Sequence, residues 1–286
     1  MIAVLDEHGE RSLISRDEYR VSVLAEAFRL AHSDAPALHL AISGALRDGF
    51  AEEALAPARR LYEIDFDRER ATVTLGTALA QSGKVDEARE LFEKFLEKNA
   101  ESNRVMTHLA RVLGAMGEAE AARDMLWKSL TLDPNQDEGL DWWGEIHFEN
   151  EGAQSFYRAM ERAAQLPASW RPQVWLARRH LEQHEIKQAL TLYQQVIEKA
   201  AGDARSLTMV SGDLVNNGYA TEVKAMILPL YDAAQHGAET GLNLIQACYE
   251  VGDRATGLAL CNAVERLARP DLDPYIKQFR EQLKQL

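Results

Sequence analysis

The sequence predicts an all-α fold, in which antiparallel helix pairs stack into a right-handed superhelical solenoid with a helical cap at each end. The main observation is an internal period of 34 residues. One series with this period consists of glycines: Gly49, Gly83, Gly117, Gly218 and Gly252. A second consists mostly of small residues: Ile42, Gly76, Ala110, Gly144, Ala177, Ser211 and Ile245. Both series lose one residue in the middle of the chain, which indicates a single deletion between Gly144 and Ala177.

Residues 70–100 show how one repeat is built. Residues 72–80 have helical spacing, and the helix is expected to end near Gly83, because glycine can adopt the left-handed conformation that ends helices. Residues 85–96 form a second amphipathic pattern. Neither helix can bury its apolar stripe alone, so neighbouring repeats must stack.

This pattern resembles the tetratricopeptide repeat (TPR) family. In that family a bulky residue precedes a small one in the first helix, and an alanine and a bulky residue follow in the second. The matching residues are Leu75-Gly76, Ala88, Phe92, Leu109-Ala110, Ala122, Leu126, Pro134, Trp143-Gly144, Ala189 and Tyr193. The resemblance covers about seven degenerate units and implies a TPR-like array over residues 35–271.

The N-terminal part of the chain, residues 1–34, is predicted to be an extended segment followed by a capping helix. Ser15 and Glu18 have the spacing of a capping box, and the helix that they open is expected to run to about Ala31. Residues 2–13 show no helical period, so they form either a short strand pair around His8-Gly9 or a loose segment.

The C-terminal part, residues 272–286, is predicted to be a second capping helix. Ile276, Phe279 and Leu283 lie on one face of it. We expect this face to be exposed, so it can swap or pair between copies of the chain, and a homodimer is possible.

The charge of the chain bears on its partners. Asp and Glu number 45 against 32 Lys and Arg, and the net charge is −13. Nucleic acids and anionic membranes attract basic surfaces, so neither is an expected partner. The five apolar residues at the N-terminus are too few for a signal-peptide core, and no segment approaches a membrane span of about 18 residues. We therefore expect a cytoplasmic protein of bacterial type.

The resemblance implies where a partner binds. In TPR arrays the first helix of each pair lines a concave groove. The resemblance implies that the second, fifth, ninth, twelfth and thirteenth residues of each unit face that groove. The groove residues assigned in this way are Arg70, Arg104, Arg111, Glu138, Asp141, Glu145, Arg171, Arg178 and Arg205. We expect a groove of alternating charge that suits an extended or helical segment with mixed charges. The alternative is that these residues form solvated helix faces that also contact neighbouring units.

No pattern typical of catalysis or of a cofactor site is found. His180 and His184 have metal-ligand spacing, but no third ligand is evident nearby, so no metal is expected. Cys248 and Cys261 are expected to be buried free thiols, since two cysteines make no disulfide framework.

Two groups of residues keep a second interpretation. The carboxylates of Glu138, Asp141 and Glu145 could be interpreted as paired carboxylates of a functional site, but a solvated helix face is the better interpretation. Trp142 and Trp175 are either core residues or an exposed anchor for a partner.

The function that these patterns favour is a protein-protein interaction scaffold or adaptor, which binds a peptide or protein segment and is not an enzyme. The alternative is an accessory or regulatory domain that works with an enzyme or with a transport or secretion system. A helical-repeat RNA binder would need a basic groove, which the acidic charge opposes.

Overall fold

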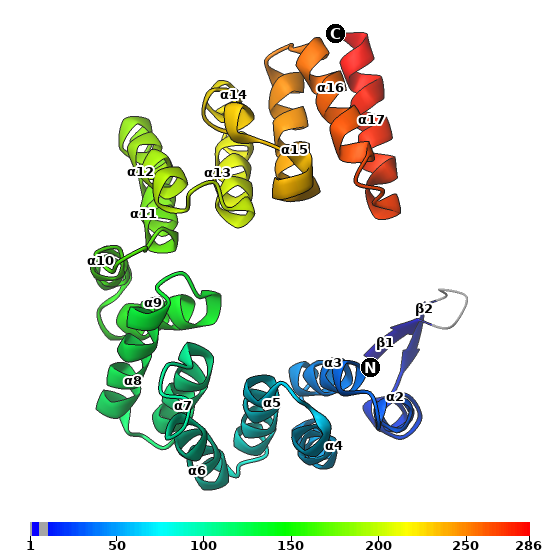
Figure 1. Ribbon diagram of the computed structural model, residues 1–286, viewed down its shortest axis with the longest axis vertical. Helices are drawn as coiled ribbons and strands as arrows, with labels where there is room; N and C mark the ends of the chain where they lie inside the picture. Colours follow the sequence, from blue (N-terminus) through cyan, green and yellow to red (C-terminus); the bar gives the residue numbers. More distant parts are fainter. Residues whose placement is uncertain (1, 6–10) are drawn as a thin grey trace. The chain divides into compact units, whose positions relative to one another are not determined.

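The structure, a computed structural model, describes residues 2–5 and 11–286. Apart from one β-hairpin, the described elements are helices joined by short turns, which confirms the all-α stack of helix pairs (Figure 1). Strands β1 (Ile2–Leu5) and β2 (Arg11–Ile14) pair antiparallel, with Ile2 opposite Ile14. The strand-pair alternative is therefore correct, while the expected turn at His8-Gly9 lies outside the described residues.

The helical segment after the hairpin starts at the predicted cap. The Ser15 hydroxyl accepts a hydrogen bond of 3.0 Å from the backbone N–H of Glu18. Helix α1 (Arg16–Glu18) then continues through a π-helical stretch, Tyr19–Leu24, into α2 (Ala25–Ala31).

The chain divides into two compact units, residues 1–132 and 133–286. The first unit contains three helix pairs: α3 (Ala35–Arg47) with α4 (Ala51–Ile64), α5 (Arg68–Gln81) with α6 (Val85–Leu96), and α7 (Asn103–Ala115) with α8 (Ala119–Leu132). The first helices α3, α5 and α7 pack against one another in order, and the second helices α4 and α6 also contact the next first helix. The first helices therefore form one layer, as the repeat requires.

The second unit contains four pairs and a final helix: α9 (Asp137–Glu151) with α10 (Ala153–Ala163), α11 (Arg171–Glu182) with α12 (Ile186–Lys199), α13 (Ala204–Asn216) with α14 (Ala220–Ile227), α15 (Ala233–Glu250) with α16 (Arg254–Glu265), and α17 (Asp273–Gln285). Short 3-10 turns occur at Leu228–Leu230 and Pro270–Leu272. Here α11, α13 and α15 form the layer of first helices.

Small residues allow the two helices of a pair to lie close together. A Cβ atom on Gly76 would come within 2.1 Å of the ring of Phe92, which is 1% exposed. A Cβ atom on Gly144 would likewise come within 2.3 Å of the ring of Phe156. The ring of the second helix therefore occupies the space that a side chain on the first helix would need.

The turns between paired helices have the predicted left-handed residue. Gly83 and Gly117 have φ values of 76° and 83°. In the α11–α12 turn the same conformation is taken by His184, with φ 58°. This histidine is therefore a turn residue, as its place in the repeat predicts.

The missing residue lies between the start of α10 and Ala177 of α11, a stretch that includes the connection of residues 164–170. Helix α10 begins nine residues after Gly144, as α6 begins nine residues after Gly76, so the deletion follows Ala153. The side chain of Asn135 holds this connection: its Oδ1 accepts from the backbone N–H groups of Trp170 and Arg171, at 2.8 and 2.9 Å. The connection is thus tied to Asn135, which lies in the turn before α9.

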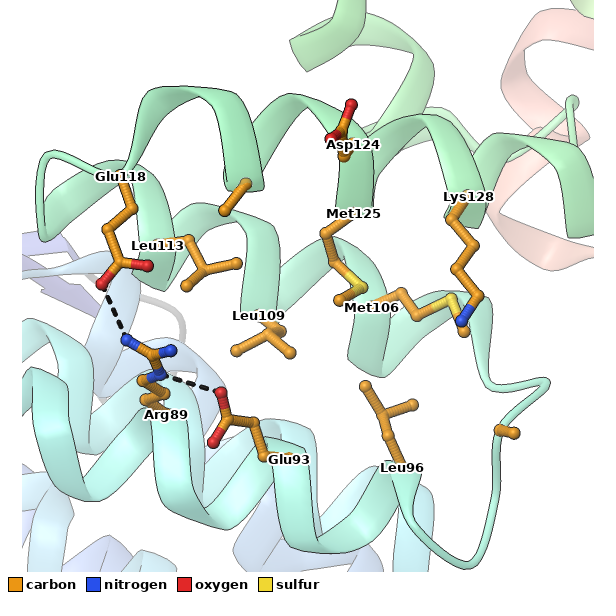
Figure 2. Close-up of a pocket in the computed structure, with 12 residues that line it drawn as sticks. Arg89, Glu93, Leu96, Met106, Leu109, Leu113, Glu118, Asp124, Met125 and Lys128 are labelled. Carbon is orange, nitrogen blue, oxygen red and sulfur yellow. Dashed lines mark hydrogen bonds and ion pairs between the residues drawn. The ribbon is translucent and has the colours of Figure 1, made fainter.

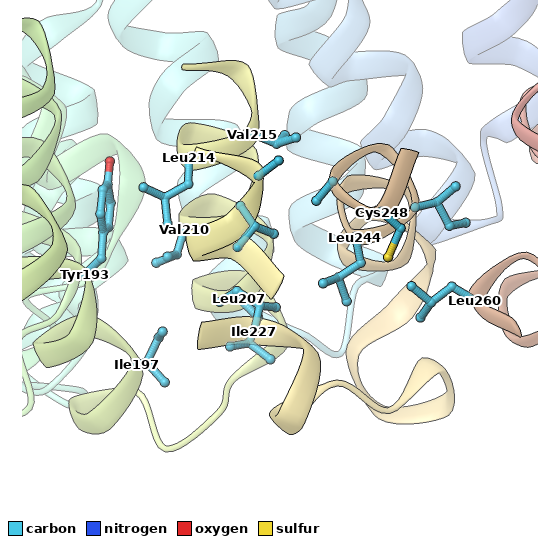
Figure 3. Packing of buried hydrophobic residues seen from close by; sticks show 14 of the residues in the cluster. Tyr193, Ile197, Leu207, Val210, Leu214, Val215, Ile227, Leu244, Cys248 and Leu260 are labelled. Carbon is cyan, nitrogen blue, oxygen red and sulfur yellow. The ribbon is translucent and has the colours of Figure 1, made fainter. Parts of the chain in front are cut away.

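The core of the second unit is continuous from α11 to α17. Figure 3 shows its side chains, including Tyr193, Leu214 and Leu244, lying between successive helices. Cys248 and Cys261 are fully buried free thiols, as expected, and burial raises the pKa of Cys248 to about 11.

The apolar face of α17 is covered within the chain. Ile276 and Leu283 are 2% and 0% exposed, and Leu283 packs against Gly257 of α16. The expectation of an exposed face was therefore wrong for these residues, because α15 and α16 already cover them. Ile276 and Leu283 therefore do not provide the exposed surface on which the homodimer was predicted.

Candidate functional site

The predicted groove arginines of the first unit differ in their surroundings. Arg70 makes a bidentate ion pair with Asp65, both contacts being 2.8 Å, and this hydrogen bonding lowers the pKa of Asp65. Arg104 is exposed and lies 3.8 Å from Glu69, while Arg111 is exposed at the surface of α7. Arg70 thus ties the start of α5 to the end of α4, and Arg104 and Arg111 are the arginines that α7 presents to solvent.

In the second unit the arginines join neighbouring first helices. Asp137 of α9 forms ion pairs with both Arg171 of α11 and Arg205 of α13. Arg171 is buried, whereas Arg205 is exposed. One carboxylate therefore bridges three successive first helices, and Arg171 belongs to the packing between repeats.

Arg178 belongs to a second, partly buried network. Its Nε donates to Asp213 of α13 at 2.8 Å, and the hydroxyl of Tyr193 donates to the same carboxylate at 3.0 Å. The Tyr193 side chain is fully buried, and burial, followed by the charge of Asp213, raises its pKa. The charge of Arg178 is therefore balanced within the chain.

The acidic residues of α9 do not form a uniform solvated face. Glu138 and Glu145 are exposed, as expected. Asp141 is half-buried, and its Oδ1 has no hydrogen-bond partner among the described residues. Burial, and then the charge of Glu145, raise the pKa of Asp141. The expected solvated face was therefore wrong for Asp141.

An aromatic pocket lies between α9, α10 and α11. Its volume is about 250 Å³, and its lining residues are Phe148, Ala153, Phe156, Tyr157, Trp175, Arg178 and Glu182. The rings of Phe156 and Trp175 meet edge to face, with centroids 5.6 Å apart. Trp175 thus lines a pocket, which is closer to the anchor interpretation than to a core residue. Trp142 is half-buried outside it.

This pocket arises where the repeat is irregular. Phe156 occupies the position that holds alanine in four other repeats: Ala54, Ala88, Ala122 and Ala189. The turn before it consists of Gly152 alone, whereas three residues separate α5 from α6. The sequence shows this irregularity as a missing alanine in the series, but a missing alanine by itself did not predict a pocket.

Two larger pockets have a different origin. The first, with a volume of about 540 Å³, has a floor that includes Leu109, Leu113 and Met125, and Arg89 on its rim pairs with Glu93 and Glu118 (Figure 2). The second, about 460 Å³, includes Leu75, Leu79 and Leu91, each 34 residues earlier than its counterpart. A pocket that recurs with the period follows from stacking the second helices and marks no special site.

The remaining candidates for chemistry do not form a site. His180 Nδ1 lies 2.6 Å from a carboxylate oxygen of Glu185. Over residues 2–5 and 11–286, no group of three or more potential ligands could hold a metal ion. Within the same ranges, every helix is too short or too polar to cross a membrane.

Comparison with solved structures gives distant similarities. The yeast Tom70 structure is 17% identical, with a TM-score of 0.49; the match covers 99% of this chain and 66% of Tom70. A tetratricopeptide repeat protein from Parabacteroides merdae is 12% identical, with a TM-score of 0.39 and coverage of 91% and 99%. Pseudomonas aeruginosa pilF is 20% identical, with a TM-score of 0.40 and coverage of 75% and 97%. At these values the roles of those proteins do not carry over to this chain.

Comparison of the sequence with curated proteins gives no match. Models of the tetratricopeptide repeat family match residues 70–94 and 104–132. These two stretches contain α8 and most of α5, α6 and α7, so the matches coincide with two of the observed helix pairs. The other pairs have the same build and period, and the chain is therefore a tetratricopeptide repeat protein.

Proposed function

We propose that this protein is a non-catalytic scaffold that holds a segment of another protein against its first helices. Tetratricopeptide repeats serve generally as protein-interaction scaffolds. The observation that supports binding at this face is on α9 and α11, where an exposed aromatic residue, Phe148, lies beside a pocket and in line with exposed carboxylates. Exposed aromatic rings next to charged groups are typical of protein interfaces.

The predicted groove residues divide into two roles within this proposal. The exposed ones contact the partner, although Arg104 and Arg205 also lie beside carboxylates of the chain: Arg104, Arg111, Glu138, Glu145 and Arg205. The less exposed arginines pair within the chain and support its packing: Arg70, Arg171 and Arg178. Asp141 is half-buried on α9. Bacterial origin and a cytoplasmic location stay predictions from the sequence, as does the exclusion of nucleic acid.

Capture of partners by the full-length chain tests the proposal. The wild type and the double variant Arg104→Glu/Arg111→Glu are immobilised, and proteins retained from a lysate of the source cells are identified by mass spectrometry. The control is Lys187→Glu/Lys199→Glu, which makes the same charge change on exposed residues of the second helix α12.

We expect the wild type and the control to retain the same partner and the α7 variant to lose most of it. Equal retention by all three chains would remove α7 from the binding face. Turnover of a substrate by the purified chain, with no retained protein, would overturn the scaffold. A retained enzyme or transport component would identify the setting as that of an accessory domain.

A further inference from the structure

We propose that the aromatic pocket, defined by Phe148, Ala153, Phe156, Tyr157, Trp175, Arg178 and Glu182, receives one aromatic side chain of the partner, and that lysine or arginine flanks this side chain. This inference rests on the proposed function and adds which kind of side chains the partner segment carries. The size, the lining and the surrounding charge of the pocket each support one part of it.

The size of the pocket suits one side chain. Sites for free ligands and cofactors have volumes of about 300–1,000 Å³, and this pocket, at about 250 Å³, is smaller. A cavity of about 150 Å³ is enough to hold a benzene molecule. A single phenyl or indole ring on a peptide therefore fits, and a cofactor does not.

The aromatic part of the lining favours a neutral ring over a cationic group. The guanidinium of Arg178 lies 5.2 Å from the ring centroid of Trp175, and that of Arg179 lies 4.2 Å from that of Tyr157. These two rings already have cations against them, so a second cation in the pocket would be repelled. An incoming aromatic ring can instead pack edge to face against Phe156 and stack on the guanidinium plane of Arg178.

The surroundings of the pocket favour positive charge next to the ring. Asp141, Glu145 and Phe148 follow the spacing i, i+4, i+7, so they lie along one face of α9. Asp141 has a buried oxygen without a hydrogen-bond partner among the described residues, and Glu145 is exposed. The charge of Arg178 is cancelled by Asp213. The residues next to the anchor therefore meet carboxylates, which lysine or arginine complements.

Binding of short labelled peptides to the full-length chain tests the inference. The probe is fluorescein-labelled Gly-Lys-Gly-Phe-Gly-Lys-Gly, followed by fluorescence anisotropy. One control peptide has alanine in place of phenylalanine, and another has glutamate in place of both lysines. We expect each replacement to weaken binding about tenfold or more, the size expected for loss of an interface anchor or of its charge complement.

A matched pair of variants ties the result to the pocket. Ala153→Trp places a bulky side chain at the exposed first residue of α10, inside the pocket lining. Ala119→Trp makes the same change at the equivalent exposed first residue of α8, 34 residues earlier. We expect Ala153→Trp to reduce affinity for the probe about tenfold and Ala119→Trp to leave it unchanged. Circular dichroism confirms that both variants are folded.

The outcomes separate this inference from the proposed function. Equal binding of the phenylalanine and alanine peptides, equal effects of the two variants, or no binding of the probe at millimolar concentration would each overturn the aromatic pocket. Preference for the glutamate peptide would overturn the charge assignment. Partner capture by the wild type, lost in the α7 variant, would in each case still support the scaffold.

Discussion

Because Gly76 lies so close to Phe92, we expect Gly76→Ala to destabilise the chain, which is the opposite of the usual effect of this substitution in a helix. Replacing glycine by alanine inside a helix normally stabilises it by about 1 kcal/mol, because glycine loses more backbone entropy on folding. At Gly76, however, the new Cβ would lie 2.1 Å from Phe92 Cζ, where ordinary contact needs 3.4 Å or more. The ring cannot turn aside into solvent, since Phe92 is 1% exposed.

The expected loss follows from these distances. Overpacking a well-packed core costs about 1–3 kcal/mol, and a displacement from 2.1 to at least 3.4 Å puts this site at the upper end. After subtracting the gain in helix propensity, Gly76→Ala should lower the free energy of unfolding by about 2 kcal/mol. Gly44 of α3 is the matched control, because only Arg47 Nη2, at 4.0 Å, comes near a Cβ there. Gly44→Ala should stabilise the chain by up to about 1 kcal/mol.

Urea unfolding followed by circular dichroism at 222 nm measures both variants. A third chain, Gly76→Ala/Phe92→Leu, frees room for the methyl group, so it should be more stable than the sum of the two single changes by about 1 kcal/mol. If Gly76→Ala raises the unfolding midpoint as Gly44→Ala does, the helices of this pair are not as close as the packing argument requires.

Three further predictions concern the second unit. Tyr193→Phe should lower the free energy of unfolding by about 1 kcal/mol. Asp213→Ala should lower it by about 2–3 kcal/mol, because it leaves the half-buried guanidinium of Arg178 unpaired. A lower urea midpoint for Tyr193→Phe than for Asp213→Ala would contradict this. Hydrogen bonding from Lys224 lowers the pKa of Asp253 from 3.8 to about 2, so its stabilisation is complete above pH about 4 and is lost as pH falls towards 2. Lys224→Ala should therefore cost about 1 kcal/mol at neutral pH and little at pH about 2, and an equal cost at both values would refute the assignment. The Cys248 thiol, buried and with its pKa raised to about 11, should react with Ellman's reagent about a hundredfold more slowly in the native chain than in urea, whereas similar rates would show that it is accessible.

Much of the fold could be predicted because its determinants are local. Helix bounds inferred for residues 72–80 and 85–96 lie within α5 and α6, since apolar spacing and turn glycines act within one repeat. The hairpin was left open because its strands are short and carry no helical or clear alternating pattern. The sequence located the deletion only to within one repeat. A missing residue shifts the positions of all later repeat residues by one, but it does not show in which helix or turn the residue is missing.

The candidate site was less predictable. Periodicity placed Arg70, Arg171 and Arg178 on the first helices, but it could not show that each is paired inside the chain. Arg171 and Arg178 pair with carboxylates on neighbouring first helices, so these two pairs depend on how repeats stack. Arg70 instead pairs with Asp65, five residues before it. Residue type and phase alone therefore overstated the number of arginines facing a partner.

By itself the sequence determined the repeat: its period, its helix pairs, its left-handed turns and the small residues that let helices approach. These features follow from interactions within about 34 residues, where spacing along the chain and position in space are closely coupled. Only the tertiary structure decided which charges are neutralised and that α15 and α16 cover the apolar face of α17. It also decided that Phe156, in place of alanine, lines a pocket with Trp175. Each of these depends on the space left between helices from different repeats, and that space is set by the packing of whole side chains.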